Sequence, residues 1–221
     1  MTPFTKWQPA SDARPLVKIC GLTRVDNALA CAEAGADIIG LVFFPKSPRD
    51  VSKARAGEIT RALPGEIPTC GVFVDADYDT LMATVDQTGI RIVQLHGSES
   101  PDLATRMSEQ GLVVVKAFFA AREPGLEKAS EYPDADFCLA EYGRGILPGG
   151  NAESWDYGLA KGFASGNRLM LAGGLTPENV SIAVRETNPG AVDISSGVEA
   201  SPGIKDIEKV SRFIQNAKSP A

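Results

Sequence analysis

Short strand-like runs alternate with longer amphipathic runs along almost the whole chain, and this rhythm limits the fold more than any other feature. The helical pattern is clear in "VDNALACAEAG", where Ala28, Cys31 and Ala32 follow the three-and-four spacing of one helix face. Several helical patterns end at a glycine, as a left-handed C-cap requires: Gly35, Gly89 and Gly111. The predicted strands are Leu16–Cys20, Asp37–Phe43, Thr69–Val74, Arg91–Leu95, Leu112–Phe118, Asp136–Glu141, Arg168–Leu171 and Val192–Ile194.

This alternation predicts eight strands, each followed by a helix, in a parallel sheet with helical crossovers. Eight such units in roughly 200 residues predict an α/β protein with a single-domain (β/α)8 or TIM barrel. An open doubly wound sheet is the alternative, but no G-x-G-x-x-G follows the first strand to favour it. The expected organisation is a flexible N-terminal extension over 1–14, the barrel over 15–217 and a C-terminal tail over 218–221.

Composition excludes several classes of function. The net charge of −6 and the absence of a basic stripe argue against nucleic acid as a partner, and no run of about 18 apolar residues indicates a membrane span. Four scattered cysteines indicate a reducing, cytoplasmic compartment, and one histidine excludes a histidine-rich metal site. An acidic chain can still bind an anion through local backbone dipoles or single cations.

Polar side chains stand where the predicted strands end. In a barrel of this kind, the chemistry sits at the carboxyl ends of the strands and on the loops that follow them. One of these residues is a thiol, placed where "LVKIC" gives way to a glycine turn. The residues at or just past strand ends are Cys20, Arg49, His96, Glu141, Gly173 and Asp193.

Two late segments, "LAGGL" and "DISSGVE", predict a phosphate site. Glycines let a backbone approach a phosphate closely, and successive N–H groups and serine hydroxyls can bind its oxygens. Phosphate sites in such barrels commonly lie at the loops after strands seven and eight. The alternative is that these glycines only turn tight corners. The candidate residues are Gly173, Gly174, Ser195, Ser196 and Gly197.

Six segments together resemble the phosphoribosylanthranilate isomerases of tryptophan biosynthesis, over residues 16 to about 216. They are "VKICGLT", "GADIIGLVFFPKSPRDVS", "GVFVD", "VQLHGSE", "LAGGLTPENV" and "VDISSGVEASPGIKD". The resemblance implies a small phosphorylated substrate, no cofactor and a monomer, since the family gives no strong reason to expect an oligomer. It also implies an Amadori rearrangement of N-(5-phosphoribosyl)anthranilate, which needs a general acid at the ring oxygen and a general base at C2.

The resemblance assigns the base to Cys20. A thiol with a pKa near about 8.5 is a modest base at neutral pH unless its surroundings lower that value. Period-two alternation places Lys18 on the same strand face, where its ammonium would favour the thiolate. The alternative for Cys20 is a small packed hydrophobe.

The assigned acid departs from the family pattern, roughly D-x-x-L-L-D, because "DFCLAE" places Glu141 where the last aspartate is usual. A partly dry pocket would suit a glutamic acid as proton donor, although its carboxyl lies one methylene further out, and small misplacements cost up to about 100-fold. A surface glutamate is the alternative. Ala152 replaces a usual glycine in the next loop, where Ala152→Gly is expected to leave turnover equal or faster. Trp155 and Tyr157 replace two aromatics and are interpreted as packing residues.

The remaining matches are candidate substrate-binding residues. Arg49 resembles the arginine at the anthranilate end, the alternative being a solvated loop arginine. Gln94 and His96 share a strand face and are expected to form a hydrogen-bonded pair, unless His96 binds a loop carbonyl. Asp193 is expected to hold a sugar hydroxyl or to orient the serine loop behind it.

Two other functions remain open. Because the acid and the following loop both depart from the family, the chain can be a phosphate-binding barrel with decayed catalysis. Retention of Cys20, Arg49, His96 and both phosphate loops argues against decay. An isomerase of a related phosphoribosyl aminoketose substrate is the other alternative, but such enzymes resemble a two-aspartate design that Cys20 with Glu141 fits poorly.

Overall fold

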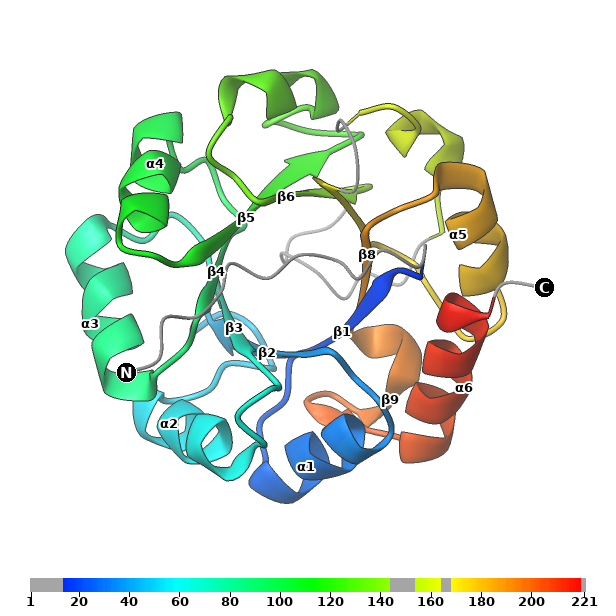
Figure 1. The fold of residues 1–221 in the computed structure, drawn as a ribbon, viewed down its shortest axis with the longest axis horizontal. Helices are drawn as coiled ribbons and strands as arrows, with labels where there is room; N and C mark the ends of the chain where they lie inside the picture. Colours follow the sequence, from blue (N-terminus) through cyan, green and yellow to red (C-terminus); the bar gives the residue numbers. More distant parts are fainter. Residues whose placement is uncertain (1–13, 144–153, 164–167, 220–221) are drawn as a thin grey trace.

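Eight parallel strands close into a barrel in the computed structural model, which describes residues 14–143, 154–163 and 168–219 (Figure 1). The predicted fold is confirmed, and the strands lie within about a residue of their predicted bounds at most ends. They are β1 Leu16–Cys20, β2 Ile38–Phe43, β3 Thr69–Phe73, β4 Ile92–Leu95, β5 Val113–Phe119, β6 Phe137–Glu141, β7 Leu169–Leu171 and β8 Ala191–Ile194.

The barrel closes between its first and last strands. In the register of this junction, Leu16 pairs with Ala191 and Lys18 pairs with Asp193. Parallel pairing places the carboxyl ends of all the strands at one end of the barrel. The ends of β1 and β8 therefore lie side by side, although they are far apart in the sequence.

Helices surround the barrel (Figure 1), and local signals fix several of their ends. Ser100 caps a helix that has Pro101 in its first turn, and Asp77 accepts a hydrogen bond from the N–H of Thr80. Gly89 ends its helix at a φ of 74°. The α-helices are α1 Val25–Glu33, α2 Lys53–Ala62, α3 Tyr78–Thr88, α4 Pro101–Glu109, α5 Val180–Thr187 and α6 Ile207–Lys218.

A full α-helix does not follow every strand in the described ranges, contrary to the regular alternation that was predicted. In the described ranges, β5 and β6 are followed only by the 3-10 helices η1 Leu126–Glu131 and η2 Tyr157–Ala160. The segment after β5 is as long as the one that contains α4, but Pro124 and Pro133 leave only eight residues between them, which form a short 3-10 helix instead of a full α-helix. Between β8 and α6, the chain forms a further 3-10 helix, η4 Ser196–Val198, and a hairpin of β9 Glu199–Ser201 with β10 Ile204–Lys205.

Two buried apolar layers stabilise the fold. One lies between barrel and helices and includes Ile19 and Leu41; the other fills the barrel and includes Ile92, Val113 and Met170. The cysteines Cys31, Cys70 and Cys138 are free thiols in these layers, as expected for core residues.

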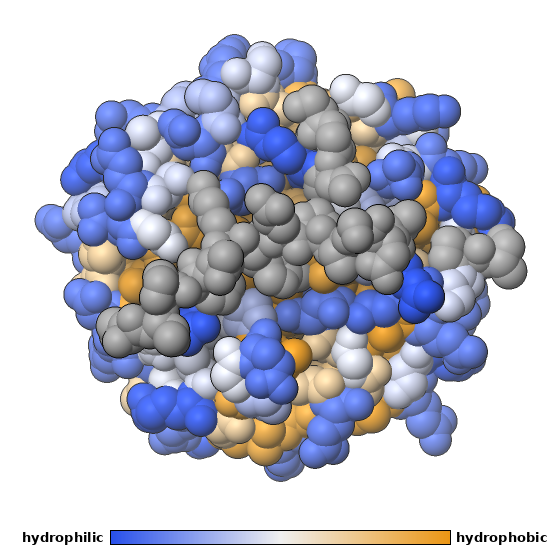
Figure 2. Space-filling model, in the orientation of Figure 1, coloured by the Kyte–Doolittle hydropathy of each residue, from blue (hydrophilic) through white to orange (hydrophobic). Residues whose placement is uncertain are grey.

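The visible face in Figure 2 carries mostly polar side chains, with apolar ones scattered between them. Among the described residues, the large apolar side chains that are exposed are Leu159 and Ile182. The helices described here include none with the length and apolar character needed to cross a membrane.

Candidate active site

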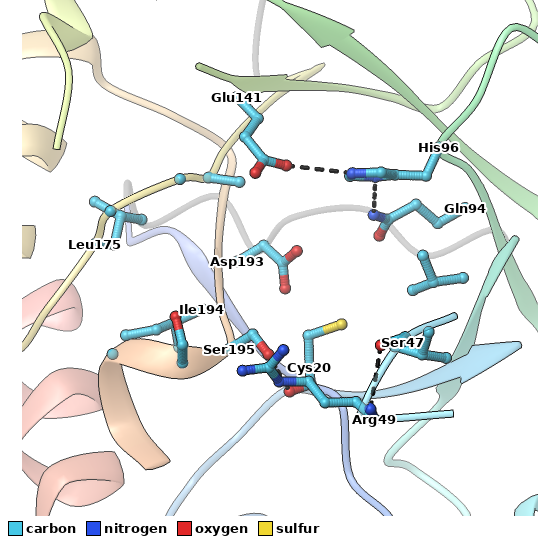
Figure 3. Close-up of a pocket in the computed structure, with 17 residues that line it drawn as sticks. Cys20, Ser47, Arg49, Gln94, His96, Glu141, Leu175, Asp193, Ile194 and Ser195 are labelled. Carbon is cyan, nitrogen blue, oxygen red and sulfur yellow. Dashed lines mark hydrogen bonds and ion pairs between the residues drawn. The ribbon is translucent and has the colours of Figure 1, made fainter. Parts of the chain in front are cut away.

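A single pocket at the carboxyl ends of the strands collects every residue that the sequence marked as a candidate (Figure 3). The pocket also contains residues that were not predicted, and these are Val42, Ser47, Val72, Ala172, Leu175 and Ile194. The predicted residues that line it are Cys20, Arg49, Gln94, His96, Glu141, Gly173, Gly174, Asp193, Ser195, Ser196 and Gly197.

Cys20, the last residue of β1, faces this pocket. Burial raises the pKa of its thiol above the ordinary value, while the ammonium of Lys18 acts in the opposite direction. The expected proximity of Lys18 is therefore confirmed, but burial outweighs the effect of its ammonium on the Cys20 pKa. A Cβ on Gly40 of the neighbouring strand would lie 2.8 Å from the Cys20 Sγ, so this glycine makes room for the thiol.

Lys18 is fully buried and donates a hydrogen bond of 2.8 Å to Oδ1 of Asp193. Burial alone would lower the pKa of Lys18, but the nearby Asp193 carboxylate and the thiols of Cys20 and Cys70 raise it above its usual range. Lys18 is thus a cation in the barrel interior. Asp193 was expected to hold a sugar hydroxyl or to orient the serine loop. In the described part of the chain, its carboxylate contacts Lys18 and not the serine loop.

Glu141, at the end of β6, forms a chain of contacts with His96 and Gln94. Its Oε2 lies 3.2 Å from Nε2 of His96, and Nδ1 of His96 lies 2.8 Å from Nε2 of Gln94. The Nε2 of His96 is nevertheless not aligned for a hydrogen bond, and among the described residues it has no hydrogen-bond partner. With an exposed fraction of 5%, Glu141 is not the surface glutamate of the alternative interpretation. Within the described ranges, the His96 ring makes no hydrogen bond to a loop carbonyl.

Arg49 is buried rather than solvated, which excludes the alternative for this residue. Its Nε and Nη2 donate to the two carboxylate oxygens of Glu199 at 2.8 and 2.7 Å. The aliphatic part of Arg49 passes over Gly21, where a Cβ would lie 2.6 Å from the arginine Cδ. Since Gly21 also has a φ of +82°, glycine is required beside the thiol.

The two glycine-rich loops contact each other directly. Gly173 and Gly174 have φ values of 82° and 65°, and neither N–H donates to another residue in the described part of the chain. A Cβ on Gly197 would collide with the backbone oxygen of Leu175, so glycine permits the close approach of the loops. The glycines do turn corners, and they also leave backbone N–H groups available at one pocket wall.

Ser195 connects the later of these loops to β1. Its hydroxyl donates to the backbone oxygen of Cys20 at 3.1 Å, and its own backbone oxygen accepts from Nζ of Lys205 at 3.1 Å. Burial lowers the pKa of Lys205, and the Glu199 carboxylate partly offsets this. The loop is therefore anchored to the thiol strand and to a buried cation.

Trp155 and Tyr157 are packing residues, as interpreted, but they also hold the loop after β7. Trp155 donates through Nε1 to the backbone oxygen of Ala172, and the Tyr157 hydroxyl donates to that of Gly173, both at 3.0 Å. Their sequence spacing gave no sign of these contacts. Ala152 and the expectations for it lie outside the described residues, as do residues 1–13 of the expected N-terminal extension.

Two further residues were not recognised from the sequence. Ser47 accepts a hydrogen bond from the backbone N–H of Arg49 through its hydroxyl, and Glu199 binds the Arg49 side chain. Ser47 stands two residues before Arg49 in "KSPR", a turn signal that points to such a contact. Within the described ranges, no cluster of histidine, cysteine and carboxylate side chains is suited to hold a metal ion.

The chain is similar to proteins of one family. The family model described as N-(5'-phosphoribosyl)anthranilate (PRA) isomerase matches residues 17–216. An N-(5'-phosphoribosyl)anthranilate isomerase from Desulfatibacillum aliphaticivorans is 52% identical, over 91% of this chain and 92% of its own length.

Solved structures agree with the sequence comparison. A structure of monomers generated from the dimeric phosphoribosylanthranilate isomerase of Thermotoga maritima matches with a TM-score of 0.81 and 36% identity, over 92% of this chain and 98% of that one. A phosphoribosylanthranilate isomerase in complex with reduced 1-(o-carboxyphenylamino)-1-deoxyribulose 5-phosphate matches with the same score, identity and coverage: 0.81, 36%, 92% and 98%.

Proposed function

The chain belongs to the N-(5'-phosphoribosyl)anthranilate isomerase family, and we propose that Cys20 is the general base and Glu141 the general acid of its reaction. The protein is a phosphoribosylanthranilate isomerase of tryptophan biosynthesis. The observation that carries the residue assignment is the placement of a thiol and a carboxyl group on opposite sides of one pocket, with Asp193 between them in the view of Figure 3.

In the first step, protonated Glu141 gives its proton to the furanose ring oxygen. The C1–O bond breaks, and the lone pair of the anilino nitrogen forms the C1=N bond of an iminium ion. The buried position of Glu141 keeps water away from this proton transfer. His96, 3.2 Å away, supports the orientation of the carboxyl group.

In the second step, the Cys20 thiolate removes the proton from C2. The C–H electrons form a C1=C2 bond and neutralise the iminium nitrogen, which gives an enolamine. Loss of the C2 hydroxyl proton and protonation of C1 then give the aminoketose, so atoms and charge balance and no cofactor is consumed. Lys18 supports the ionised thiol, because its ammonium lowers the Cys20 pKa.

The two anionic ends of the substrate would be held by different walls of the pocket. Arg49 would bind the anthranilate carboxylate, and the N–H groups of Gly173, Gly174 and Gly197 with the hydroxyls of Ser195 and Ser196 would bind the phosphate. This separation orients the sugar between acid and base.

The sugar itself would contact the polar side chains in the centre of the pocket. Asp193 is proposed to accept from a sugar hydroxyl, because Lys18 occupies only part of its acceptor capacity. Gln94 and His96 are proposed to bind the open-chain intermediate, since both side chains line the pocket.

The experiment is turnover of phosphoribosylanthranilate, generated in the cuvette and followed by the decay of its fluorescence. Cys20→Ala and Glu141→Gln are each expected to lose at least about 100-fold in kcat. Cys31→Ala is the matched control, since Cys31 is an equally buried thiol in α1, away from the pocket. Normal kcat in either of the first two variants would remove that residue from its role.

The remaining expectations concern the state of the protein in the cell. We propose that it is a cytoplasmic monomer that binds no nucleic acid, in contrast to the dimeric Thermotoga maritima relative. The four free cysteines support a reducing compartment, and the scarcity of large exposed apolar side chains among the described residues supports a monomer. Sedimentation equilibrium at the mass of a dimer would contradict the monomer.

A further inference from the structure

We propose that Glu199 is a positioning residue that fixes the guanidinium of Arg49 for the carboxylate end of the substrate and sets its place relative to the phosphate loop. This inference rests on the proposed function of Arg49. Glu199 does not line the pocket; it would act through Arg49, which does.

The contact between the two side chains is a two-point one. Nε and Nη2 of Arg49 donate to Oε1 and Oε2 of Glu199 at 2.8 and 2.7 Å, a fork-to-fork arrangement that fixes the plane of the guanidinium. Nη1 donates to no other residue in the described part of the chain. The remaining donors of the guanidinium are therefore available for a ligand carboxylate.

The charged side chains around Glu199 leave one positive charge in excess, which can bind an anion. Nζ of Lys205 lies 2.8 Å from the same carboxylate, so one anion faces two cations. Burial would raise the pKa of Glu199, but the hydrogen bonds and charges of Arg49 and Lys205 hold it at about 2, so the carboxylate is ionised at neutral pH. One positive charge remains uncompensated by Glu199, and Arg49 carries it to the pocket surface.

Glu199 also connects this cation to the phosphate loop. Lys205, which binds Glu199, donates as well to the backbone oxygen of Ser195 at 3.1 Å. The N–H of Gly203 donates to Glu199 Oε1 at 3.1 Å, so the β9–β10 hairpin encloses the carboxylate. The hairpin is in turn fixed to α1, because Asn27 makes hydrogen bonds of 3.0 and 2.7 Å to the backbone of Lys205.

The Arg49–Glu199 ion pair is not needed to hold the Arg49 side chain in place. The aliphatic part of Arg49 already packs over Gly21, beside Cys20, so packing alone holds the base of the side chain. What Glu199 adds is the direction of the guanidinium at the end of that side chain. Loss of this direction would weaken substrate binding without moving the thiol or Glu141.

The test is a double-mutant cycle on the full chain with phosphoribosylanthranilate as substrate. Glu199→Gln keeps the size of the side chain and removes its charge, and is expected to raise KM by about tenfold or more while kcat changes less than about threefold. Arg49→Met, which keeps the aliphatic packing, is expected to raise KM at least as much. In the double variant, Glu199→Gln should add less than about twofold to KM, because it acts through Arg49.

Glu58→Gln is the matched control, because Glu58 pairs with an arginine on the exposed surface of α2 and should leave KM and kcat unchanged. Independent, multiplying effects of Glu199→Gln and Arg49→Met would overturn the inference. So would a fall in kcat with an unchanged KM.

The outcomes separate this inference from the proposed function. An unchanged KM in Arg49→Met contradicts the role proposed for Arg49 itself. A raised KM in Arg49→Met with an unchanged KM in Glu199→Gln contradicts only the inference. If Glu199→Gln does not fold, as judged by its thermal transition, Glu199→Asp takes its place: a shorter carboxylate that keeps its charge but reaches Arg49 less well should raise KM in the same way.

Discussion

Nζ of Lys18 lies 2.8 Å from Oδ1 of Asp193, inside the barrel and across the junction at which β1 pairs with β8. The lysine is fully buried, so its charge is compensated by this carboxylate and not by water. The pair lies next to Cys20 and influences its pKa with opposite signs: Lys18 lowers it and Asp193 raises it. The ionisation of the Cys20 thiol, the proposed base, thus depends on a contact that exists only in the closed barrel.

Lys18→Met is expected to move the pH dependence of kcat/KM to higher pH. If Cys20 is the base as proposed, it must be ionised, and kcat/KM should rise with pH as Cys20 loses its proton. Removal of Lys18 takes away the charge that lowers the Cys20 pKa and leaves Asp193, which raises it. Measurement of kcat/KM between pH 6 and 10 for both proteins checks this, and an ascending limb that stays in place or moves to lower pH would contradict it.

Lys116→Met is the control for that experiment and carries its own prediction. Lys116 is another fully buried lysine, whose ammonium lies 3.3 Å from Glu99 and donates to three backbone oxygens, including that of Gly97 at 2.7 Å. Because the change leaves a buried carboxylate unpaired, it should lower the free energy of unfolding by about 3 kcal/mol or more. Urea denaturation measures this loss. The comparison is Lys128→Met, because Lys128 pairs with Glu131 on the exposed surface and its loss is expected to cost less than about 1 kcal/mol.

Glu141→Asp tests how far the site is adapted to a glutamate as the proposed acid. The resemblance described above implies an aspartate at this position, whereas the Glu141 carboxyl of this chain lies 3.2 Å from the His96 ring. Shortening the side chain would withdraw the carboxyl group from the ring, and kcat should fall by about 10- to 100-fold with little change in KM. Steady-state kinetics decide the point; an unchanged or higher kcat would show that the extra methylene serves no purpose.

Gly40→Ala is expected to displace the thiol. The new Cβ would lie 2.8 Å from Sγ and 2.9 Å from Cα of Cys20, closer than such atoms pack. We expect kcat to fall by about tenfold or more, since the change would move the proposed base away from C2 of the substrate. Gly65→Ala is the matched control, because no atom lies within 4 Å of its added Cβ; equal kcat values in the two variants would refute the steric argument.

The fold and the centre of the site could be predicted because they depend on local signals. Strands ending at Cys20 and Glu141 are visible in the sequence as short apolar runs, and parallel pairing necessarily brings their ends together. The shared strand face of Gln94 and His96 predicted the contact that the structure has at 2.8 Å.

The supporting contacts could not be predicted because they join segments with no local relation. Arg49 and Glu199 are 150 residues apart, and a glutamate after a glycine loop has the same appearance whether it is solvated or paired. A full helix was predicted where the structure has the 3-10 helix η1, because the regular alternation was extended to a segment in which Pro124 and Pro133 leave only eight residues between them. Hydrophobic periodicity reports which face is buried, not which polar groups meet.

The pairing of β1 with β8 also means that the pocket joins the first and the last parts of the barrel to be synthesised. The ribosome makes Cys20 175 residues before Ser195, whose hydroxyl binds the backbone oxygen of that same cysteine. Until the eighth strand has been made, Lys18 lacks the carboxylate of Asp193, and the loop after β8 and the β9–β10 hairpin have not been synthesised. A nascent chain that ends before β8 therefore has the Cys20 thiol but no complete pocket. Isomerase activity is expected only once β8 pairs with β1 and closes the barrel.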